Sequence, residues 1–376
     1  MYFAATIAIK PPIMKFLYPL LLSFFCFFTA CAQVDSLTEA PHVFYRDGKI
    51  TLHSVAGGKA VTETVSLKSK VRIHVMPSGH PDWNFTVGLK KDLIIEPAVS
   101  KGAAKTLFIS DIEGEFAAFR AILLANKVID EKYNWIFGTG NLVICGDLFD
   151  RGKEVTEGLW LLYKLEQDAV AKGGYVHTIL GNHDIMNLSG DLRYLDARYP
   201  ALARTMGMPY TDLYGPDTEL GRWLRTKNTI EKIGDNLCAH AGIAPQITAL
   251  ALSLDDINKK CRPYYDKAKK LSDVGKIDSS IASFFDGKTS LFWYRGYFAE
   301  PKATEAEVNA TLALYQVKRI VVGHTIVPGN VGFYYGGKVL GLDVNQHAGK
   351  HEAALLENGA WYKVNDKGTT SEIQIL

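Results

Sequence analysis

Short apolar runs, separated by stretches of helical periodicity, follow one another from about residue 105 onward. We interpret the apolar runs as buried strands, and they are Thr106–Ile109, Leu142–Cys145, Val176–Leu180, Leu237–Ala239 and Ile320–Val322. Between them, Glu115–Asn126 and Glu154–Ala171 repeat apolar residues at the spacing of one helix face, and 246–271 and 303–316 are further helical candidates. This order predicts an α/β fold over 105–376, with a layered β-sheet core flanked by helices.

The segments on either side of this pattern are rich in β-forming residues. Residues 44–95 alternate such residues with turn pairs such as Asp47-Gly48 and Gly57-Gly58, which predicts a small antiparallel β region. Residues 32–41 precede it as a short tether, and the tail from Val331 returns to strands. We therefore divide the chain into residues 1–31, a tether and β-rich region over 32–104, and the α/β domain over 105–376.

Each of the five apolar runs ends in residues that can bind metal ions. They are Ser-Asp-Ile-Glu-Gly at 110–114, Gly-Asp-Leu-Phe-Asp-Arg-Gly at 146–152, Gly-Asn-His-Asp at 181–184, and the isolated His240 and His324. A buried parallel sheet brings the loops after its strands to one edge, so we expect these groups to lie together. Oxygen and nitrogen ligands gathered in this way can hold two divalent ions, which is a means of hydrolysing phosphate esters.

Each of these residues also has a structural interpretation when it is taken alone. Asp147 suits a turn after a strand, and Asn182 suits the start of a helix. A histidine after an apolar run, such as His240 or His324, is ordinarily a core residue with satisfied hydrogen bonds. The appearance of all of them at successive strand ends favours a metal site.

The overall charge argues against a nucleic acid partner. The chain has 42 basic and 40 acidic residues and no basic block. Beyond residues 1–31, its cysteines are Cys145, Cys238 and Cys261. Three cysteines cannot form a fully paired framework, so we expect buried free thiols.

The strongly apolar segment 16–30 predicts an export signal. It is shorter than the roughly 20 residues that a membrane-spanning helix needs, and Lys15 precedes it. The small pair Thr29-Ala30 leads directly to Cys31, which resembles a bacterial lipoprotein signal with a lipid-anchored cysteine. We expect an exported protein, periplasmic or at the cell surface and anchored to the membrane through Cys31. An ordinary cleaved secretory signal is the alternative, and Met14 would make a more typical signal start than Met1.

The motif set resembles the calcineurin-like metallophosphoesterase superfamily. Within it, the order of Gly-Asp-x-x-Asp-Arg-Gly, Gly-Asn-His-Asp, a lone His and Gly-His-Thr is similar to the PPP-type phosphatase branch. The longer segment 181–194, Gly-Asn-His-Asp-Ile-Met-Asn-Leu-Ser-Gly-Asp-Leu-Arg-Tyr, is similar to the Shewanella-like phosphatase group. The resemblance covers about residues 105–345.

This resemblance implies a dinuclear metal site. Asp111 and Glu113 would bind the first ion, and Asp147 would bridge both. The second ion would be completed by Asn182, His240 and His324. A carboxylate suits the bridging position because it offers two oxygens and a negative charge to two close cations.

The resemblance also implies the groups that act on substrate. His183 would protonate the leaving oxygen, and Asp150 would orient its imidazole while a metal-bound hydroxide attacks phosphorus in line. Arg151 would clamp the phosphoryl oxygens, and Arg295 and Asn182 would also contact substrate. Arg193 and His347 are weaker candidates.

Glu113 departs from the family pattern, which has a histidine at this position. The first ion would then have an all-oxygen shell, which favours Mn²⁺, Mg²⁺ or Fe over Zn²⁺. The alternative is a degraded first site.

The sequence therefore predicts a metal-dependent phosphatase that hydrolyses phosphomonoesters, with phosphorylated Ser, Thr or Tyr side chains of proteins as substrates. The alternatives are a small-molecule phosphatase, nucleotidase or dinucleotide hydrolase with the same core, and a non-catalytic surface lipoprotein.

Overall fold

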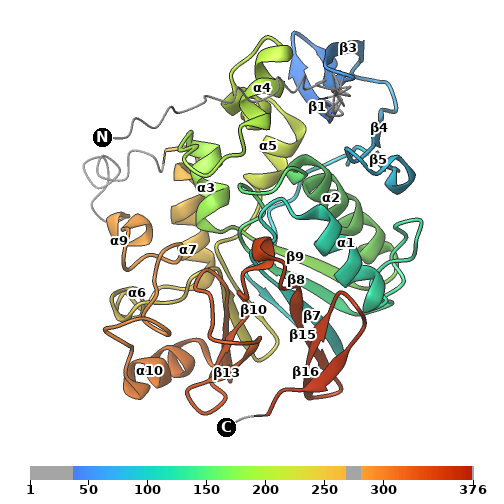
Figure 1. Cartoon of the computed structure of the whole chain (residues 1–376). Helices are drawn as coiled ribbons and strands as arrows, with labels where there is room; N and C mark the ends of the chain where they lie inside the picture. The colour runs from blue at the N-terminus through green and yellow to red at the C-terminus, as the bar shows by residue number, and fades with distance from the viewer. Residues whose placement is uncertain (1–36, 268–280, 375–376) are drawn as a thin grey trace, which may run out of the picture. The chain divides into compact units, whose positions relative to one another are not determined.

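The computed structural model describes residues 37–267 and 281–374 (Figure 1). The apolar runs form β7 (Lys105–Ile109), β8 (Asn141–Cys145), β9 (Tyr175–Ile179), β11 (Asn236–Ala239) and β12 (Arg319–Val322). The first two predicted helices are α1 (Phe116–Ala125) and α2 (Val155–Ala171), within one residue of their expected bounds. The predicted α/β fold is thus confirmed.

Two six-stranded sheets form the centre of the fold, in the orders β17-β16-β15-β7-β8-β9 and β13-β14-β12-β11-β10-β6. Their remaining members are β6 (Val99–Ser100), β10 (Ile230–Ile233), β13 (Gly332–Tyr334), β14 (Val339–Gly341), β15 (Glu352–Glu357), β16 (Ala360–Asn365) and β17 (Thr370–Glu372). The expectation that one parallel sheet carries all five apolar runs was wrong. β7, β8 and β9 are parallel in one sheet, whereas β11 and β12 are parallel in the other.

Burial on both faces explains why these strands are apolar without alternation. In β8, Leu142 and Ile144 face the core under the helices, whereas Val143 and Cys145 face the layer between the sheets. An apolar run therefore predicts a buried strand but not the strand with which it pairs. The layer between the sheets is a separate apolar cluster, in which Val143 from one sheet lies with Val321 from the other.

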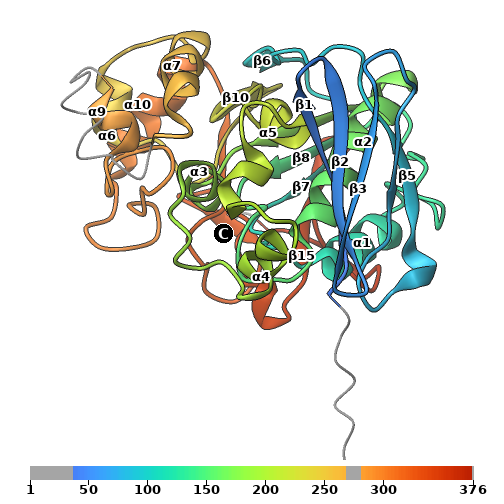
Figure 2. The ribbon, with the colours of Figure 1, turned by 90° about the horizontal axis from the view of Figure 1, so that it is seen from above.

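Two helical insertions follow the central strands (Figure 2). Between β9 and β10 lie α3 (Asn182–Ser189), α4 (Arg198–Thr205) and α5 (Glu219–Leu224). Between β11 and β12 lie α6 (Pro245–Ala249), α7 (Leu254–Cys261), α9 (Ala282–Phe285) and α10 (Glu305–Tyr315). The 3-10 helices are η1 (Pro81–Trp83), η2 (Tyr210–Tyr214), η3 (Arg262–Tyr264) and η5 (Gln346–Ala348).

The helix expected over 246–271 is broken within its described part. The chain leaves α6 at Ala249, and Ala251 adopts a left-handed conformation with φ 47°. A new helix, α7, then begins with Ser253 as its N-cap, whose side chain accepts the N–H of Asp256. Residues 268–271 of this prediction lie outside the described residues.

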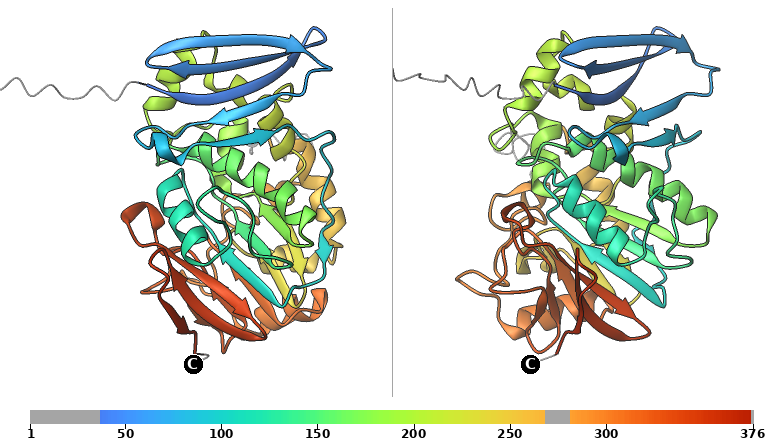
Figure 3. Two further views of the ribbon diagram at one scale, coloured as in Figure 1. Left: turned by 90° about the vertical axis from the view of Figure 1, so that its right-hand side faces the viewer. Right: turned by 45° about the vertical axis from the view of Figure 1, so that its right-hand side comes forward.

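The β-rich N-terminal region packs beside α2 and α5 (Figure 3). Its strands are β1 (Glu39–Arg46), β2 (Lys49–Ala56), β3 (Lys59–Ser66), β4 (Arg72–Val75) and β5 (Phe85–Gly88), all antiparallel to their partners. β1 begins inside the expected tether. It is held by hydrogen bonds from Trp160 Nε1 to the Pro41 carbonyl (3.0 Å) and from the Tyr45 N–H to the Asp217 carbonyl (2.8 Å).

Cys145, Cys238 and Cys261 are buried free thiols, as predicted. Within 37–267 and 281–374, no helix is both long and apolar enough to cross a membrane. The predicted signal segment 16–30 and Cys31 lie outside the described residues.

Candidate metal centre

The loops after the central strands hold the candidate residues in an unusual backbone conformation. Six of these residues have positive φ, which costs a non-glycine residue about 1–3 kcal/mol and persists only where the surroundings impose it. They are Asp111 (53°), Glu113 (47°), Asp147 (57°), Asp150 (76°), Arg151 (56°) and His324 (64°). Hydrogen bonds between the loops impose it here, such as that from the Glu113 N–H to the Asp147 carbonyl at 2.9 Å.

Two glycines of the motifs leave room for ligand carboxylates. A Cβ at Gly181 would lie 2.1 Å from Asp147 Oδ1, and one at Gly323 would lie 2.3 Å from Asp111 Oδ2. The carboxylate of Asp184 fixes the same loops by accepting the N–H groups of Leu148 (2.8 Å) and Gly181 (2.7 Å). The glycines and Asp184 of these motifs therefore position the ligands without being ligands themselves.

Asp147, His240 and His324 form one group of buried ligand atoms, all within 4.8 Å of one another. His240 Nδ1 bonds the Cys145 carbonyl at 2.8 Å, so its Nε2 is directed at Asp147 Oδ2 (3.1 Å) and Asn182 Oδ1 (2.9 Å). His324 Nε2 is buried and has no hydrogen-bond partner among the described residues. An orphaned imidazole nitrogen beside a carboxylate is the arrangement that a divalent cation would complete.

Glu113, Asp147 and His183 form a second such group, so Asp147 belongs to both. Glu113 Oε1 also pairs with Arg151 Nε at 2.8 Å. Asp111 lies outside both groups. Its carboxylate accepts the Ser110 hydroxyl and the His324 N–H (3.0 Å), although it lines the same cavity.

The buried carboxylates repel one another. Burial, together with the nearby charge of Asp343, raises the pKa of Asp111 well above its usual range. Burial and the charge of Asp147 raise the pKa of Glu113 to about 8, and burial also raises the pKa of Asp343. Raised pKa values mean that these carboxyl groups tend to hold protons, which bound divalent cations would displace, so the donor set fits metal ions.

The histidines respond to burial and to this charge in opposite ways. Burial favours the neutral ring of His240, but the charge of Asp147 outweighs it and raises the pKa of His240 to about 10. Burial lowers the pKa of His324 well below its usual value, which keeps that ring neutral. For Asp147 itself, burial is outweighed by His240 and His183, and its pKa is lowered. His324 and Asp147 are therefore in the forms that bind metals, a neutral imidazole and an ionised carboxylate, whereas His240 would release its proton when it binds an ion.

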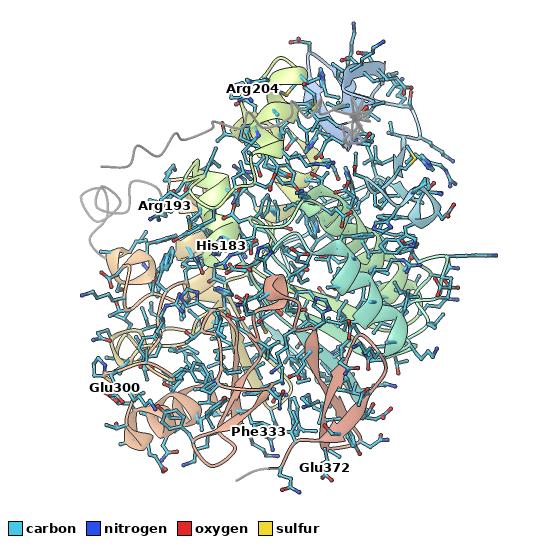
Figure 4. The ribbon with its side chains drawn as sticks, viewed as in Figure 1. His183, Arg193, Arg204, Glu300, Phe333 and Glu372 are labelled. Carbon is cyan, nitrogen blue, oxygen red and sulfur yellow. The ribbon has the colours of Figure 1, made fainter. Side chains whose placement is uncertain are left out.

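His183 is held by a chain of hydrogen bonds from α3 and η2. Its Nδ1 lies 2.6 Å from Asp150 Oδ2, and Asn187 Nδ2 donates to the other oxygen of Asp150 at 2.7 Å. Tyr210 donates its hydroxyl to Asn187 in turn (2.9 Å). The free Nε2 of His183, the residue labelled in Figure 4, lies 3.8 Å from both Asp147 Oδ2 and Glu113 Oε1, so these distances direct it toward the metal ligands.

A cavity of about 350 Å³ opens over these groups. Arg151 and Arg295 line it, and Arg295 Nη1 is fixed by the His324 carbonyl at 2.9 Å. The weaker candidates lie outside the cavity lining, because Arg193 pairs with Asp191 at the surface (2.9 Å) and His347 bonds Glu115 (2.7 Å).

Several residues that line the cavity are not among the candidates predicted from the sequence. Asp343, Tyr194, Trp293 and Ile326 all face this cavity. Asp343 follows β14 in the way that Asp111 follows β7, so an apolar run ending in Asp was a usable signal. The aromatic residues come from insertions that carry no such pattern.

The chain resembles known phosphatases over most of its length. The family model described as calcineurin-like phosphoesterase matches residues 104–328. A crystal structure of the cold-active protein-tyrosine phosphatase of a psychrophilic Shewanella species is 36% identical, with a TM-score of 0.80, covering 90% of this chain and 99% of that one.

Two eukaryotic relatives match the catalytic region. Shewanella-like protein phosphatase 2 of Arabidopsis thaliana is 25% identical over 287 residues, 64% of this chain and 71% of that protein. Shewanella-like protein phosphatase 1 of Plasmodium berghei is 28% identical over 243 residues, 62% of this chain and 65% of that protein.

Proposed function

Since the chain belongs to the calcineurin-like phosphoesterase family and is a metal-dependent phosphatase, we propose that its substrates are phosphotyrosine side chains of proteins. The observation that carries this proposal is the aromatic mouth of the cavity. The Tyr194 ring lies 5.1 Å from the ring of His183, and the Trp293 ring lies 5.6 Å from that of His324. Two aromatic walls beside the reacting groups suit a phenyl ring carrying the phosphate. The Shewanella structure with 36% identity, which is named a protein-tyrosine phosphatase, supports the same substrate class.

We assign the metal ligands as the resemblance implies. Asp111, Glu113 and Asp147 would hold the first ion, and Asp147 with Asn182, His240 and His324 would hold the second. Divalent ions in such a site activate water and offset the negative charge of the phosphoryl group.

The remaining residues act on the substrate directly. The guanidinium groups of Arg151 and Arg295 bind the phosphoryl oxygens with planar, charged donors. His183 delivers the proton from its Nε2 to the leaving oxygen, and Asp150 holds Nδ1 so that Nε2 points toward the ligands at 3.8 Å.

A substrate panel tests this function. We expect manganese-loaded protein to turn over para-nitrophenyl phosphate and phosphotyrosine peptides faster than phosphoserine and phosphothreonine peptides of the same sequence. Adenosine monophosphate and diadenosine tetraphosphate serve as the comparison for a nucleotide-acting enzyme. Preference for either nucleotide over the phosphotyrosine peptide would overturn the proposed substrate class.

We propose manganese as the bound metal, because Glu113 makes the first site rich in oxygen. Glu113→His is expected to keep activity, lower the pH optimum and broaden metal tolerance, since a neutral ligand removes one negative charge from the site. Glu113→Gln is expected to raise the Mn²⁺ requirement by about tenfold or more. Metal titrations and pH–rate profiles measure both effects. If Glu113→Ala matched the wild type in metal stoichiometry and pH profile, Glu113 would not be a metal ligand, and its role would be limited to the ion pair with Arg151.

We also propose that the protein is exported and that Cys31 carries a lipid anchor, which holds the enzyme at a membrane outside the cytoplasm. The motivation is the apolar segment 16–30 that ends in Thr-Ala-Cys. Cys31→Ser is expected to move the protein from the membrane to the soluble fraction of expressing cells, whereas the matched Cys26→Ser leaves it at the membrane. A wild-type protein found entirely in the soluble fraction would contradict the proposal.

A further inference from the structure

A second polar site lies at the end of the sheets opposite to the metal centre. In the parallel pair β11 and β12, Asn236 is opposite Arg319, and Cys238 is opposite Val321. Alternate residues of a strand face the same side, and Cys238 and Val321 belong to the apolar layer between the sheets. Asn236 and Arg319 therefore lie at the starts of their strands, on the side that faces the apolar layer between the sheets.

Arg319 has no anionic partner among residues 37–267 and 281–374. Its guanidinium lies 5.5 Å from the ring centre of Trp361 and 5.6 Å from that of Phe333. Its Nε is buried without a hydrogen-bond partner in this part of the chain. The nearby carboxylate of Asp235 is bonded instead to Lys318, at 2.7 Å. The guanidinium therefore has neither a hydrogen bond at Nε nor an ion-pair partner in the described part of the chain.

A cavity lies directly at this arginine. It has a volume of about 500 Å³ and is lined by Arg319, Asn236, Trp361 and the ion pair of Asp235 with Lys318, together with the backbone around Gly102 and Gly234. This volume is within the range of about 300–1,000 Å³ for small-molecule sites. Asn236 is 5% exposed, and its Oδ1 has no hydrogen-bond partner among the described residues.

A further cavity, remote from the metal centre, also contains buried charged groups, but its positive charges are paired. Between α2, α5 and the segment before β6, Lys227 bonds both Glu96 and Glu166, and Lys90 also bonds Glu166. Its lysines are already neutralised by carboxylates of the chain. Arg319 bonds no carboxylate among residues 37–267 and 281–374, because Asp235 in the same lining is bonded to Lys318, so its terminal nitrogens can take up an anion.

We propose that the cavity at Arg319 binds a small oxyanion, a carboxylate or a phosphate group, on the terminal nitrogens of the guanidinium. The guanidinium lies beside two aromatic rings whose centres are themselves 5.5 Å apart, and its planar fork presents two parallel donors, which match two oxygens of such a group. The site is distinct from the metal centre. β12 runs from Arg319 toward His324, which separates the two by roughly 15 Å at the rise of an extended strand. In Figure 4, Phe333 lies near the lower edge of the molecule and His183 lies in its upper half.

Fluorine NMR of the full-length protein labelled with fluorotryptophan tests this site directly. The Trp361 signal is assigned with Trp361→Phe, and the metal-free protein is titrated with sodium phosphate or sodium acetate at constant ionic strength. We expect a saturable shift of the Trp361 signal. Saturation by phosphate alone indicates a phosphoryl ligand, and saturation by acetate alone indicates a carboxylate ligand.

Two variants and a matched control decide the role of Arg319. Arg319→Lys keeps the charge but loses the paired donors, and is expected to weaken binding by about tenfold, equivalent to about 1.4 kcal/mol. Arg319→Gln is expected to abolish saturation, whereas Arg204→Lys, at an exposed arginine on α4, leaves it unchanged (Figure 4). A wild-type shift that stays linear with either anion, or equal affinity in Arg319→Lys and the wild type, would overturn the proposal. The latter comparison holds even if Arg319→Gln fails to fold.

Discussion

Asp147→Asn is expected to reduce kcat for para-nitrophenyl phosphate by about 10³-fold or more and to lower the bound metal content. The carboxylate of Asp147 belongs to both groups of ligand atoms, is 1% exposed, and faces His240 Nε2 at 3.1 Å. An amide keeps the shape but loses the charge that two close cations need. A loss of about 4 kcal/mol in the transition state corresponds to about 10³-fold in rate, which is within the contribution of metal ions to such reactions.

Metal analysis and kinetics must be measured on the same samples to interpret this variant. Asp217→Asn is the matched control, because its carboxylate pairs with Arg46 at the surface and is remote from the cavity lining. Circular dichroism establishes that both variants are folded. Wild-type activity and metal content in Asp147→Asn would show that Asp147 does not bind the ions. The proposed metal site, in which Asp147 is shared by both ions, would then be wrong.

The strand ends that carry the site could be predicted because burial on both faces leaves a plain signal. The runs before Asp111, Asp147 and Asn182 are buried and mainly apolar, with Thr106, His177 and Thr178 as the exceptions, since helices cover one face and the second sheet covers the other. The polar residue that follows then marks where each strand leaves the core. The partition of these strands between two sheets was missed, because pairing depends on contacts between distant segments that no local pattern records.

The part of the metal-centre cavity that is formed by Tyr194, Trp293 and Asp343 could not be predicted, because its position also depends on contacts between distant segments. Tyr194 and Trp293 reach it from insertions whose path depends on tertiary packing, and their local sequence is typical of a loop. Asp343 lies in the tail from Val331 that the sequence predicts only as strands, whereas β14 ends at Gly341 and leaves Asp343 near Asp111 and Asp147. The pairing of Glu113 with Arg151 was also unexpected, since both residues had been given separate roles.

His183→Ala is expected to lower kcat by about 10²–10⁴-fold on substrates with poor leaving groups, such as phosphoserine peptides, which is the usual contribution of a general acid. The loss should be much smaller with para-nitrophenyl phosphate, whose leaving group needs little protonation. Because Asn182 is adjacent and lies 2.9 Å from His240, metal content must be shown to be unchanged. Equal losses on both substrates at full metal content would exclude His183 as the acid.

The pH dependence gives this assignment an independent test through Asp150. Burial favours neutral His183, but the charge of Asp147 and the hydrogen bond to Asp150 outweigh it and raise the pKa of His183 to about 8. The protonated ring is the acid, so activity on poor leaving groups should fall as the pH rises through the pKa of His183. Asp150→Asn removes a charge that stabilises the imidazolium, which lowers that pKa and should move the fall to lower pH. An alkaline limb that stays in place in Asp150→Asn, or that persists in His183→Ala, would mean that another group donates the proton.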